Sequence, residues 1–311
     1  MSSLVSIVLP IFGMIGLGFL AVKAGLVSAK AGEGLADYVF ALAVPALIFR
    51  MLSESSAPLD SSPWGYWLSY FIAVAVVWVL AMIFARRVFD RDTREAVIHG
   101  FSSAQSNTVF LGIPLILRAY GEAGAVPLFL LLAIHLPIMM AVASILIETT
   151  GSPGQSGGVK RFARTLVTHP ILLALIAGVA AKLLGVRTPD YLKPLLDSLA
   201  NSASPVALIS MGIGLALYGF RSDPKAAWTV AAFKLVLHPL LVYLLGTYVF
   251  RLEPVFTGVA VLFAALPSGI NGYLLAMRYK TAEAFASNTI AISTAASVVT
   301  VAAWLWILGV G

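Results

Sequence analysis

The sequence predicts an all-α polytopic membrane protein in which ten transmembrane helices form two inverted repeats of five. Three observations predict this fold class. The 311 residues are 60% hydrophobic and only 11% charged, with a mean hydropathy of +0.95. The apolar residues fall into ten stretches of membrane-spanning length. Two of these stretches, at equivalent places in the two halves, are interrupted by asparagine, glycine and proline.

The composition excludes several classes of protein. A soluble domain carries about 25% charged residues, so this chain cannot cover its apolar surface with a polar one. The net charge of +6 is attributed to lysines and arginines in cytoplasmic loops rather than to a nucleic-acid partner. The absence of cysteine excludes disulfides, thiolate metal sites and a cysteine nucleophile. The apolar run from Leu4 follows no basic segment and continues into a full-length span, so no cleavable signal peptide is expected.

About 20 apolar residues are needed to cross the hydrocarbon core as a helix. Ten segments reach this length, and most connections between them are short and rich in Gly, Pro, Asp and Lys. The longest connection is the Gly/Ser-rich TTGSPGQSGGVKRFAR (149–164), which ends in a basic cluster. The predicted spans are residues 4–23, 33–52, 64–85, 95–119, 124–147, 165–185, 191–218, 225–250, 254–278 and 282–309.

The distribution of basic residues predicts the orientation, because cytoplasmic loops carry an excess of lysine and arginine. The loops after spans 1, 3, 5, 7 and 9 hold thirteen of them, whereas the opposite side holds six. Lys234 is left inside a span. The odd-numbered loops are therefore expected in the cytoplasm, with both termini outside.

The chain matches itself when it is shifted by 160 residues. The matches lie in the first two spans of each half and include residues rarer than the surrounding Ala, Leu and Gly. Examples are Pro10 with Pro170, Asp37 with Asp197, and Pro45 with Pro205. Each half has five spans, an odd number, so the halves must insert in opposite orientations. The predicted units are a first repeat over 1–148, a cytoplasmic linker over 149–164 and a second repeat over 165–311.

The interruptions lie at corresponding positions of the two halves, in SNTVFLGIP (106–114) and LPSGINGY (266–273). Paired interruptions of this kind are typical of secondary transporters, whose broken helices form the substrate site near the bilayer midplane. New half-helices are expected to begin near Leu111–Gly112 and near Ile270–Asn271. Their backbone N–H groups and positive dipole ends would then point into the crossing and favour an anion.

The residue types in the breaks suit a carboxylate. Amide and hydroxyl side chains supply hydrogen bonds, glycines allow close approach of the backbone, and neither break contains lysine or arginine, which favours release of the anion in each cycle. The predicted substrate-binding residues are Asn107, Thr108, Gly112, Pro114, Pro267, Ser268, Gly269 and Asn271. The alternative is that proline and glycine merely kink two helices and that the asparagines cap the broken ends.

Ionisable residues inside spans are costly and are treated as functional candidates. Asp37 and Asp197 either complement helix starts and loop cations or act in gating and coupling at opposite faces. Lys234 lies near the middle of span eight and must pair, extend to the surface or lose its proton. Charge compensation of the substrate, proton coupling and a structural ion pair all remain open for this lysine.

Several neutral oxygen donors could ligate Na⁺, although hydrogen bonding between helices explains them equally well. They are Gln105, Ser102, Ser103, Asn288 and Thr289. Three histidines, His135, His169 and His238, each lie near a proline, which favours hydrogen bonding at helix kinks, and their spacing indicates no metal site. No cofactor is expected beyond a coupling ion, either H⁺ or Na⁺.

The two breaks carry a family resemblance. SNTVFLGIPLILRAYG (106–121) and ALPSGINGYLLAMRYK (265–280) resemble the paired motifs of the auxin efflux carrier family. That family includes the plant PIN auxin carriers and bacterial permeases associated with malate, malonate and other carboxylates. Ten spans with external termini agree with it along the whole chain.

The resemblance implies the fold of sodium/proton antiporters and bile-acid symporters, with broken helices four and nine crossing. It further implies a scaffold of spans 1, 2, 6 and 7, a moving transport domain of spans 3–5 and 8–10, and a homodimer formed through the scaffold. It assigns Asn107 to the substrate carboxylate. The chain departs from the plant carriers in its Asn271-Gly272 and in lacking their long cytoplasmic loop. Auxin as substrate and loop phosphorylation are therefore not carried over.

The sequence thus predicts a secondary active or facilitative carrier of small organic anions in a bacterial cytoplasmic (inner) membrane. It would work by alternating access, with an elevator-like or rocking motion. One rival is a cation/proton antiporter, which normally needs an acidic residue that both breaks lack. A non-transporting sensor is disfavoured because no soluble domain is appended. No enzyme is expected, because neither a Ser/His pair nor paired acids lie at a suitable spacing.

Overall fold

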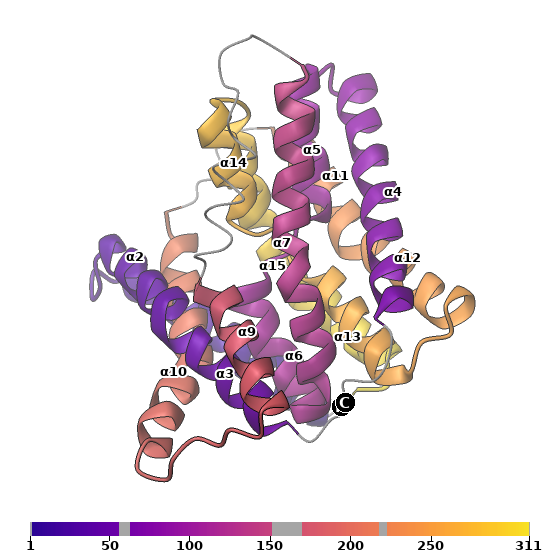
Figure 1. The fold of residues 1–311 in the computed structure, drawn as a ribbon. Helices are drawn as coiled ribbons and strands as arrows, with labels where there is room; N and C mark the ends of the chain where they lie inside the picture. The colour runs from indigo at the N-terminus through magenta and orange to yellow at the C-terminus, as the bar shows by residue number, and fades with distance from the viewer. Residues whose placement is uncertain (1, 56–62, 151–169, 218–222, 311) are drawn as a thin grey trace.

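The computed structural model describes residues 2–55, 63–150, 170–217 and 223–310, and the regular structure within these ranges is helical (Figure 1). An isolated antiparallel bridge between Ser106 and Ser268 is the one strand-like pairing in this part of the chain. The all-α prediction is therefore confirmed for the described residues. The predicted linker lies mostly outside them.

The α-helices follow the predicted spans closely. They are α1 (Ser2–Lys23), α2 (Ala29–Tyr38), α3 (Val44–Glu54), α4 (Trp64–Val88), α5 (Thr93–Ala104), α6 (Ile113–Tyr120), α7 (Ala125–Glu148), α9 (Pro170–Leu183), α10 (Lys193–Leu215), α11 (Pro224–Ala232), α12 (His238–Leu244), α13 (Pro254–Ala265), α14 (Asn271–Tyr279) and α15 (Glu283–Ile307). Four π-helical turns extend or join them, at Val39–Ala43, Thr108–Gly112, Phe233–Leu237 and Leu245–Val249.

An aspartate side chain caps the N-terminus of two of the helices. The Asp92 carboxylate accepts a hydrogen bond from the Glu95 N–H at 2.8 Å and caps α5. The Asp223 carboxylate does the same for the Ala226 N–H at the start of α11, where Pro224 supplies no N–H of its own. Both caps satisfy backbone donors that a helix start leaves without a partner.

Among the described residues, seven helical stretches are long and apolar enough to cross a membrane, judged by length and composition. Six match predicted spans one, two, three, seven, eight and ten, and Thr108–Glu148 covers the end of span four together with span five. Pro170–Leu183 and Pro254–Ala265 are apolar but shorter. Span nine is broken, and the predicted start of span six lies outside the described residues. The count of ten spans and the inverted repeat therefore remain predictions.

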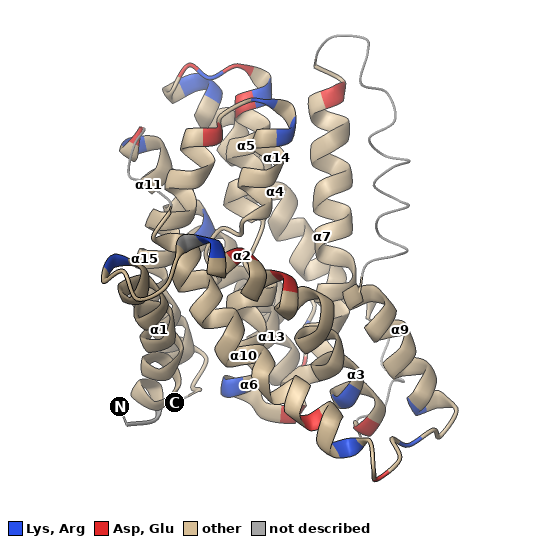
Figure 2. Ribbon diagram, turned by 90° about the vertical axis from the view of Figure 1, so that its left-hand side faces the viewer, with Lys and Arg blue, Asp and Glu red and all other residues tan. Residues whose placement is uncertain are grey.

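The surface has the character expected for a lipid-exposed protein. Large apolar side chains point outward in the middle of several helices, for example Leu17, Ile176 and Val299, which are 63%, 67% and 72% exposed. Most charged residues lie toward the two opposite ends of the helices, and the start of α1 and the end of α15 lie at the same end (Figure 2). This distribution is typical of helices that cross a bilayer.

The helices form two groups. In the first, α10 packs against α1, α2 and α3, and α3 packs against α9. Helices α1 and α10 approach closely because each carries a glycine at the contact: a Cβ on Gly18 would lie 2.3 Å from the Ile209 carbonyl oxygen, and one on Gly212 would lie 2.0 Å from that of Ile15. The second group comprises α4–α7 and α11–α15, with α13 in contact with α4, α6, α7, α12 and α15.

The half-helices that lead into the two breaks lie at the centre of the second group. Every residue from Val259 to Leu266 in and after α13 is fully buried, and so is nearly all of Ala96 to Ala104 in α5. Helix α13 is apolar on nearly all sides, and α5 buries His99, Ser102 and Ser103 together with its apolar residues, so both are enclosed by other helices. The breaks that follow them are thus held in the protein interior.

Candidate functional site

The two breaks meet in the interior of the molecule. Ser106 and Ser268 pair as an antiparallel bridge, and the Asn107 N–H donates to the Pro267 carbonyl at 2.9 Å. Backbone groups that a helix would normally satisfy are therefore satisfied across the crossing. This contact joins residues about 160 positions apart in the chain, as the offset between the two motifs predicts.

Two serines cap the helix ends in a reciprocal arrangement. The Ser106 hydroxyl donates to the Phe263 carbonyl in the last turn of α13, at 2.7 Å, and the Ser268 hydroxyl donates to the Ser102 carbonyl in the last turn of α5, at 2.6 Å. The last carbonyls of a helix have no partner within it. Each break thus supplies a donor to the helix that leads into the other break.

Gln105 links the breaks a third time. Its side-chain oxygen accepts a hydrogen bond from the Gly269 N–H at 2.9 Å, and its amide nitrogen donates to the Ser106 carbonyl at 2.7 Å. A Cβ on Gly269 would lie 2.6 Å from the Gln105 oxygen, so the contact requires a residue without a side chain. Gln105, a candidate Na⁺ ligand, therefore uses its oxygen to position the start of the α14 segment.

A cavity of about 320 Å³ lies against the crossing. Five of the predicted functional residues line it: Asp37, Asn107, Thr108, Gly269 and Asn271. Its volume is at the small end of the range for ligand sites, and such sites combine apolar walls with a few polar groups. The cavity fits that description, since the remaining walls are mainly apolar residues of α2, α7, α9 and the two broken helices.

The polar groups of the cavity come from both breaks. Asn107, only 8% exposed, contacts the Met211 sulfur through its amide nitrogen at 3.4 Å. Asn271 is the first residue of α14, so it stands where the positive end of that helix meets the cavity. Phe40 and Phe110, whose rings meet edge to face at 5.1 Å, form an aromatic wall.

Four other predicted residues lie at the crossing without lining the cavity. Pro267 and Ser268 use their polar groups in the contact between the breaks, and the Ser268 N–H also donates to the Ser293 hydroxyl at 3.1 Å. Gly112 packs against Leu266, since a Cβ there would lie 2.7 Å from its Cδ1. Pro114 is buried in the first turn of α6.

The first half-helix begins earlier than predicted. Helical backbone resumes at Thr108, in a π-helical turn, rather than near Leu111–Gly112. Asn107, with φ −75° and ψ 75°, marks the end of the non-helical stretch, and its carbonyl already accepts the Gly112 N–H at 3.0 Å. The second half-helix begins at Asn271, as predicted.

Lys234 lies beside the crossing in a fully buried position. Its ammonium donates to the Ala264 carbonyl in the last turn of α13 and lies 3.4 Å from Nδ1 of His238. The salt bridges of the described residues do not include it. Its side-chain nitrogen instead faces the negative end of a half-helix, where a cation would be favourable.

The two aspartates related by the repeat have different surroundings. Asp197 accepts a hydrogen bond from Arg50 at 2.9 Å, in a partly exposed ion pair between α10 and α3. Asp37 is exposed and lines the cavity. Asp197 therefore pairs with a cation, which is the structural alternative. Asp37 lies where its carboxylate can influence which ions enter the cavity.

The remaining candidates lie on α15 and near the crossing. Asn288 is buried there, and the Thr289 hydroxyl donates to the Phe285 carbonyl within the helix. The Ser103 hydroxyl likewise donates to His99 within α5. No cluster of three or more His, Cys, Asp or Glu suited to a metal ion occurs among the described residues. His169 lies outside them.

Comparison with known proteins decides the family. A family model described as "Membrane transport protein" matches residues 3–305, nearly the whole chain. The chain belongs to the auxin efflux carrier family of membrane transporters. The resemblance seen in the two break motifs is thereby confirmed.

Three relatives of this carrier family illustrate its range. The chain is 34% identical to a protein of Rhizobium meliloti (strain 1021) named "Putative malonate transporter", over 100% of the chain and 98% of the relative. It is 22% identical to the "Uncharacterized transporter YfdV" of Escherichia coli (strain K12), over 96% of each. It is 25% identical to "Auxin efflux carrier component 8" of Arabidopsis thaliana, over 88% of the chain and 89% of the relative.

Sequence reasoning missed part of the candidate site. Ser106 lies inside the SNTVFLGIP segment but is not among the predicted site residues, although it provides one of the reciprocal caps. His135, expected to serve a helix kink, lies next to the crossing: its Nε2 lies 3.4 Å from the Ser106 nitrogen and its Nδ1 lies 3.2 Å from the Tyr70 hydroxyl. The apolar walls formed by Phe40 and Leu136 carry no sequence signal at all.

Proposed function

We propose that this member of the auxin efflux carrier family is a secondary active or facilitative carrier of small organic anions that bear a carboxylate. The observation that carries the proposal is the small cavity formed where the two breaks meet. It presents Asn107, Thr108 and Asn271 beside the N-terminal end of α14. Hydrogen-bond donors and a positive helix end favour a carboxylate.

The cavity would hold the anion without a salt bridge. The described residues that line it include no lysine or arginine. Neutral hydrogen-bond donors bind an anion less tightly than a lysine or arginine does. The weaker binding suits a carrier that must release its substrate in every cycle. The malonate named for the Rhizobium meliloti relative is a dicarboxylate of suitable size and is the first substrate to test.

Transport would proceed by alternating access. In this proposal α1, α2, α3, α9 and α10 form the scaffold, and the helices around the two breaks form the domain that moves in an elevator-like manner. The two five-span halves, 1–148 and 165–311, would be inverted repeats. The separate packing of the two helix groups supports this division.

The carrier would reside in a bacterial cytoplasmic membrane with both termini outside, as a homodimer through the scaffold. On the predicted orientation Asp37 lies near the cytoplasmic end of span two. Because Asp37 lines the cavity and is exposed, the structure would correspond to a state open toward the cytoplasm. H⁺ and Na⁺ are both candidates for the coupling ion, and uniport is the third possibility.

The decisive experiment is transport by the purified protein in liposomes. A panel of labelled mono- and dicarboxylates, with malonate and malate included, is presented while Na⁺ and pH gradients are imposed separately. Uptake or exchange of at least one carboxylate is expected. If no organic anion moves, and none raises the unfolding temperature of the purified protein, the proposal is wrong.

Two substitutions test the site itself. Asn107→Ala and Asn271→Ala should each weaken binding of the transported anion about tenfold or more, the equivalent of one lost hydrogen bond to a charged group. Asn201→Ala, on an exposed position of α10, is the matched control. Unchanged anion affinity in both cavity variants, with the fold intact, would show that these asparagines only cap the broken helices.

Asp37 favours a second candidate, a cation/proton antiporter on the same fold, because it places a carboxylate at the cavity. Asp37→Asn separates the two functions. If the Asp37→Asn variant still transports anions but no longer responds to a pH gradient, Asp37 couples protons to anion transport. Cation exchange that is driven by a pH gradient, needs Asp37 and ignores carboxylates would establish the antiporter instead.

A further inference from the structure

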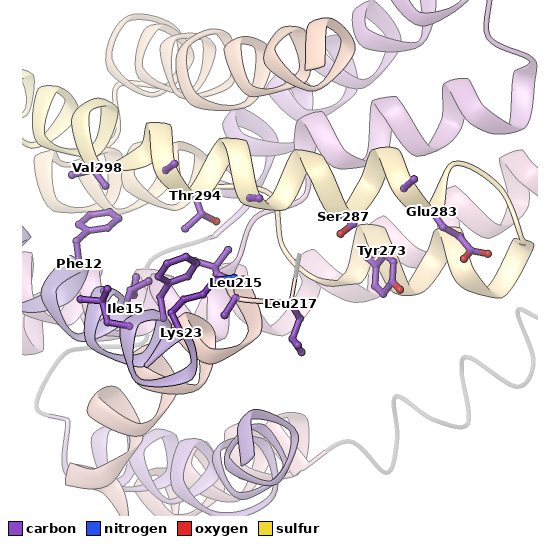
Figure 3. Close-up of a pocket in the computed structure, with 17 residues that line it drawn as sticks. Phe12, Ile15, Lys23, Leu215, Leu217, Tyr273, Glu283, Ser287, Thr294 and Val298 are labelled. Carbon is purple, nitrogen blue, oxygen red and sulfur yellow. The ribbon is translucent and has the colours of Figure 1, made fainter. Parts of the chain in front are cut away.

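A second and larger cavity lies away from the crossing. It has a volume of about 1070 Å³ and separates α1 and the end of α10 from α14 and α15 (Figure 3). Only one of its lining residues, Tyr273, comes from the segment that contains the second break. The anion cavity and this one share no lining residue, so they are distinct sites.

The chemistry of the larger cavity changes along its length. Phe12 and Val298 lie at one end, Tyr273 and Glu283 lie at the other, and Lys23 lies between them (Figure 3). The apolar end is continuous with surface that faces outward, because Val298 lines the cavity and is 39% exposed. The cavity therefore runs from an apolar region to a cation and then to an anion.

The dimensions correspond to one leaflet of a bilayer. Eleven residues of helix separate Phe12 from Lys23, a rise of about 16 Å, and fifteen separate Glu283 from Val298, about 22 Å. Half of the hydrocarbon core is about 15 Å thick. The apolar end would thus lie near the midplane and Glu283 nearest the membrane surface, with Lys23 between them.

We propose that this cavity binds a zwitterionic aminophospholipid, phosphatidylethanolamine. One acyl chain would lie along Phe12 and Val298, the phosphate would contact Lys23, and the ammonium would be directed toward Glu283. The order of groups along the cavity is the order along the lipid: acyl chain, phosphate, amine. Basic pockets between helices at the cytoplasmic side bind the headgroups of anionic phospholipids; here the carboxylate of Glu283 beside Lys23 suits a zwitterionic headgroup instead.

The ring beneath the lysine supports this assignment. The Lys23 ammonium lies 5.6 Å from the centre of the Phe19 ring, and Phe19 also lines the cavity. An aromatic face holds a cation by its negative quadrupole and limits its freedom. Lys23 is thereby held over the cavity. An anionic lipid would be repelled by Glu283, whereas the amine of phosphatidylethanolamine would not.

The test measures lipid binding to the purified full-length protein, independently of transport. Delipidated protein is titrated with phosphatidylethanolamine or phosphatidylglycerol in detergent and followed by native mass spectrometry and thermal unfolding. Phosphatidylethanolamine should bind about tenfold more tightly than phosphatidylglycerol. Lys23→Gln should weaken both lipids, and Glu283→Gln should abolish the preference between them.

Filling the cavity provides an independent arm. Ala295 lines the cavity and is exposed, so Ala295→Phe should block the acyl site and remove binding of both lipids. Val299→Phe, on an outward-facing position of the same helix, and Lys225→Gln, an exposed lysine outside the cavity, are the controls. Undiminished binding to Ala295→Phe, or equal loss in the controls, would overturn the proposal. So would equal affinity of the wild-type protein for the two lipids.

Discussion

At the scale of single residues, the crossing depends on a few buried polar groups that form hydrogen bonds to the backbone of the two breaks. Gln105 is 1% exposed and makes two hydrogen bonds, to the backbone of Gly269 and of Ser106. A buried donor or acceptor left without a partner costs about 1–3 kcal/mol. Such residues fix the geometry of the cavity without lining it.

Gln105→Leu is expected to destabilise the crossing. The substitution retains the approximate size of the side chain but leaves the Gly269 N–H without its partner. It also removes one of the two donors to the Ser106 carbonyl, the other being the Thr108 N–H. We expect a loss of about 1–3 kcal/mol in unfolding free energy and weaker anion binding. Thermal unfolding with and without the transported anion measures both effects. An unchanged unfolding temperature would show that the two breaks are held by their serines and backbone alone.

Lys234 offers a second prediction at this scale. Lys234→Met preserves an unbranched side chain but removes the donor to the Ala264 carbonyl and the charge at the end of α13. The unfolding temperature should fall, and it should fall by more than in Lys225→Met, which alters an exposed lysine in the preceding helical segment. Equal unfolding temperatures in the two variants would mean that the buried ammonium has no net structural effect.

Residue patterns predicted part of this site and could not predict the rest. Asn107, Asn271 and Gly269 were identifiable because amides and glycines are conspicuous in a membrane span. Phe40 and Met211 were not, because an apolar residue in an apolar helix carries no information about its neighbour. Those contacts join segments far apart in the chain and depend on how the helices pack.

At the scale of helices, sequence reasoning was most accurate for long apolar segments. The predicted span over 64–85 corresponds to α4 (Trp64–Val88), since a continuous run of apolar residues both forms and limits the helix. It was least accurate at the first break, where the π-helical turn begins at Thr108. Nothing in the order Asn-Thr-Val-Phe distinguishes a π-helical turn from three further residues of irregular backbone.

The contact between α1 and α10 gives a prediction for a helix pair. Gly212→Ala would place a methyl group against the backbone of Ile15, which cannot move aside as a side chain can. Overpacking of this kind costs about 1–3 kcal/mol, so the unfolding temperature should fall clearly. The measurement is thermal unfolding of the purified protein in detergent.

Gly13→Ala is the control for this pair, because a Cβ at Gly13 meets no atom within 4 Å. Because alanine has a higher helix propensity than glycine, this substitution should leave the stability of the protein unchanged or slightly improve it. If Gly212→Ala and Gly13→Ala unfold at the same temperature, the close approach of the two helices contributes nothing to stability.

At the scale of the whole molecule, the inverted repeat predicts that equivalent loops lie on opposite sides of the membrane. Ser28 follows span one, and Tyr191 lies close to the position 160 residues later, after span six. The chain has no cysteine, so Ser28→Cys and Tyr191→Cys each introduce a single reactive thiol. Both positions are exposed.

A membrane-impermeant maleimide applied to intact cells should label Tyr191→Cys and leave Ser28→Cys unlabelled until the membrane is permeabilised. The cysteine-free parent protein supplies the background. Labelling of both thiols from the same side would contradict the inverted repeat, and labelling in the reverse order would retain the repeat but reverse the predicted orientation.

The reciprocal serine caps have a consequence for biosynthesis. The Ser102 carbonyl accepts its hydrogen bond from the hydroxyl of Ser268, which is synthesised 166 residues later. At about 5–20 residues per second, the first half remains in the membrane for roughly 8–33 s before its partner exists. Until then the open end of α5 must be solvated or shielded by other means. The nascent first half is therefore a distinct, incomplete species that the insertion machinery has to hold until the second break arrives.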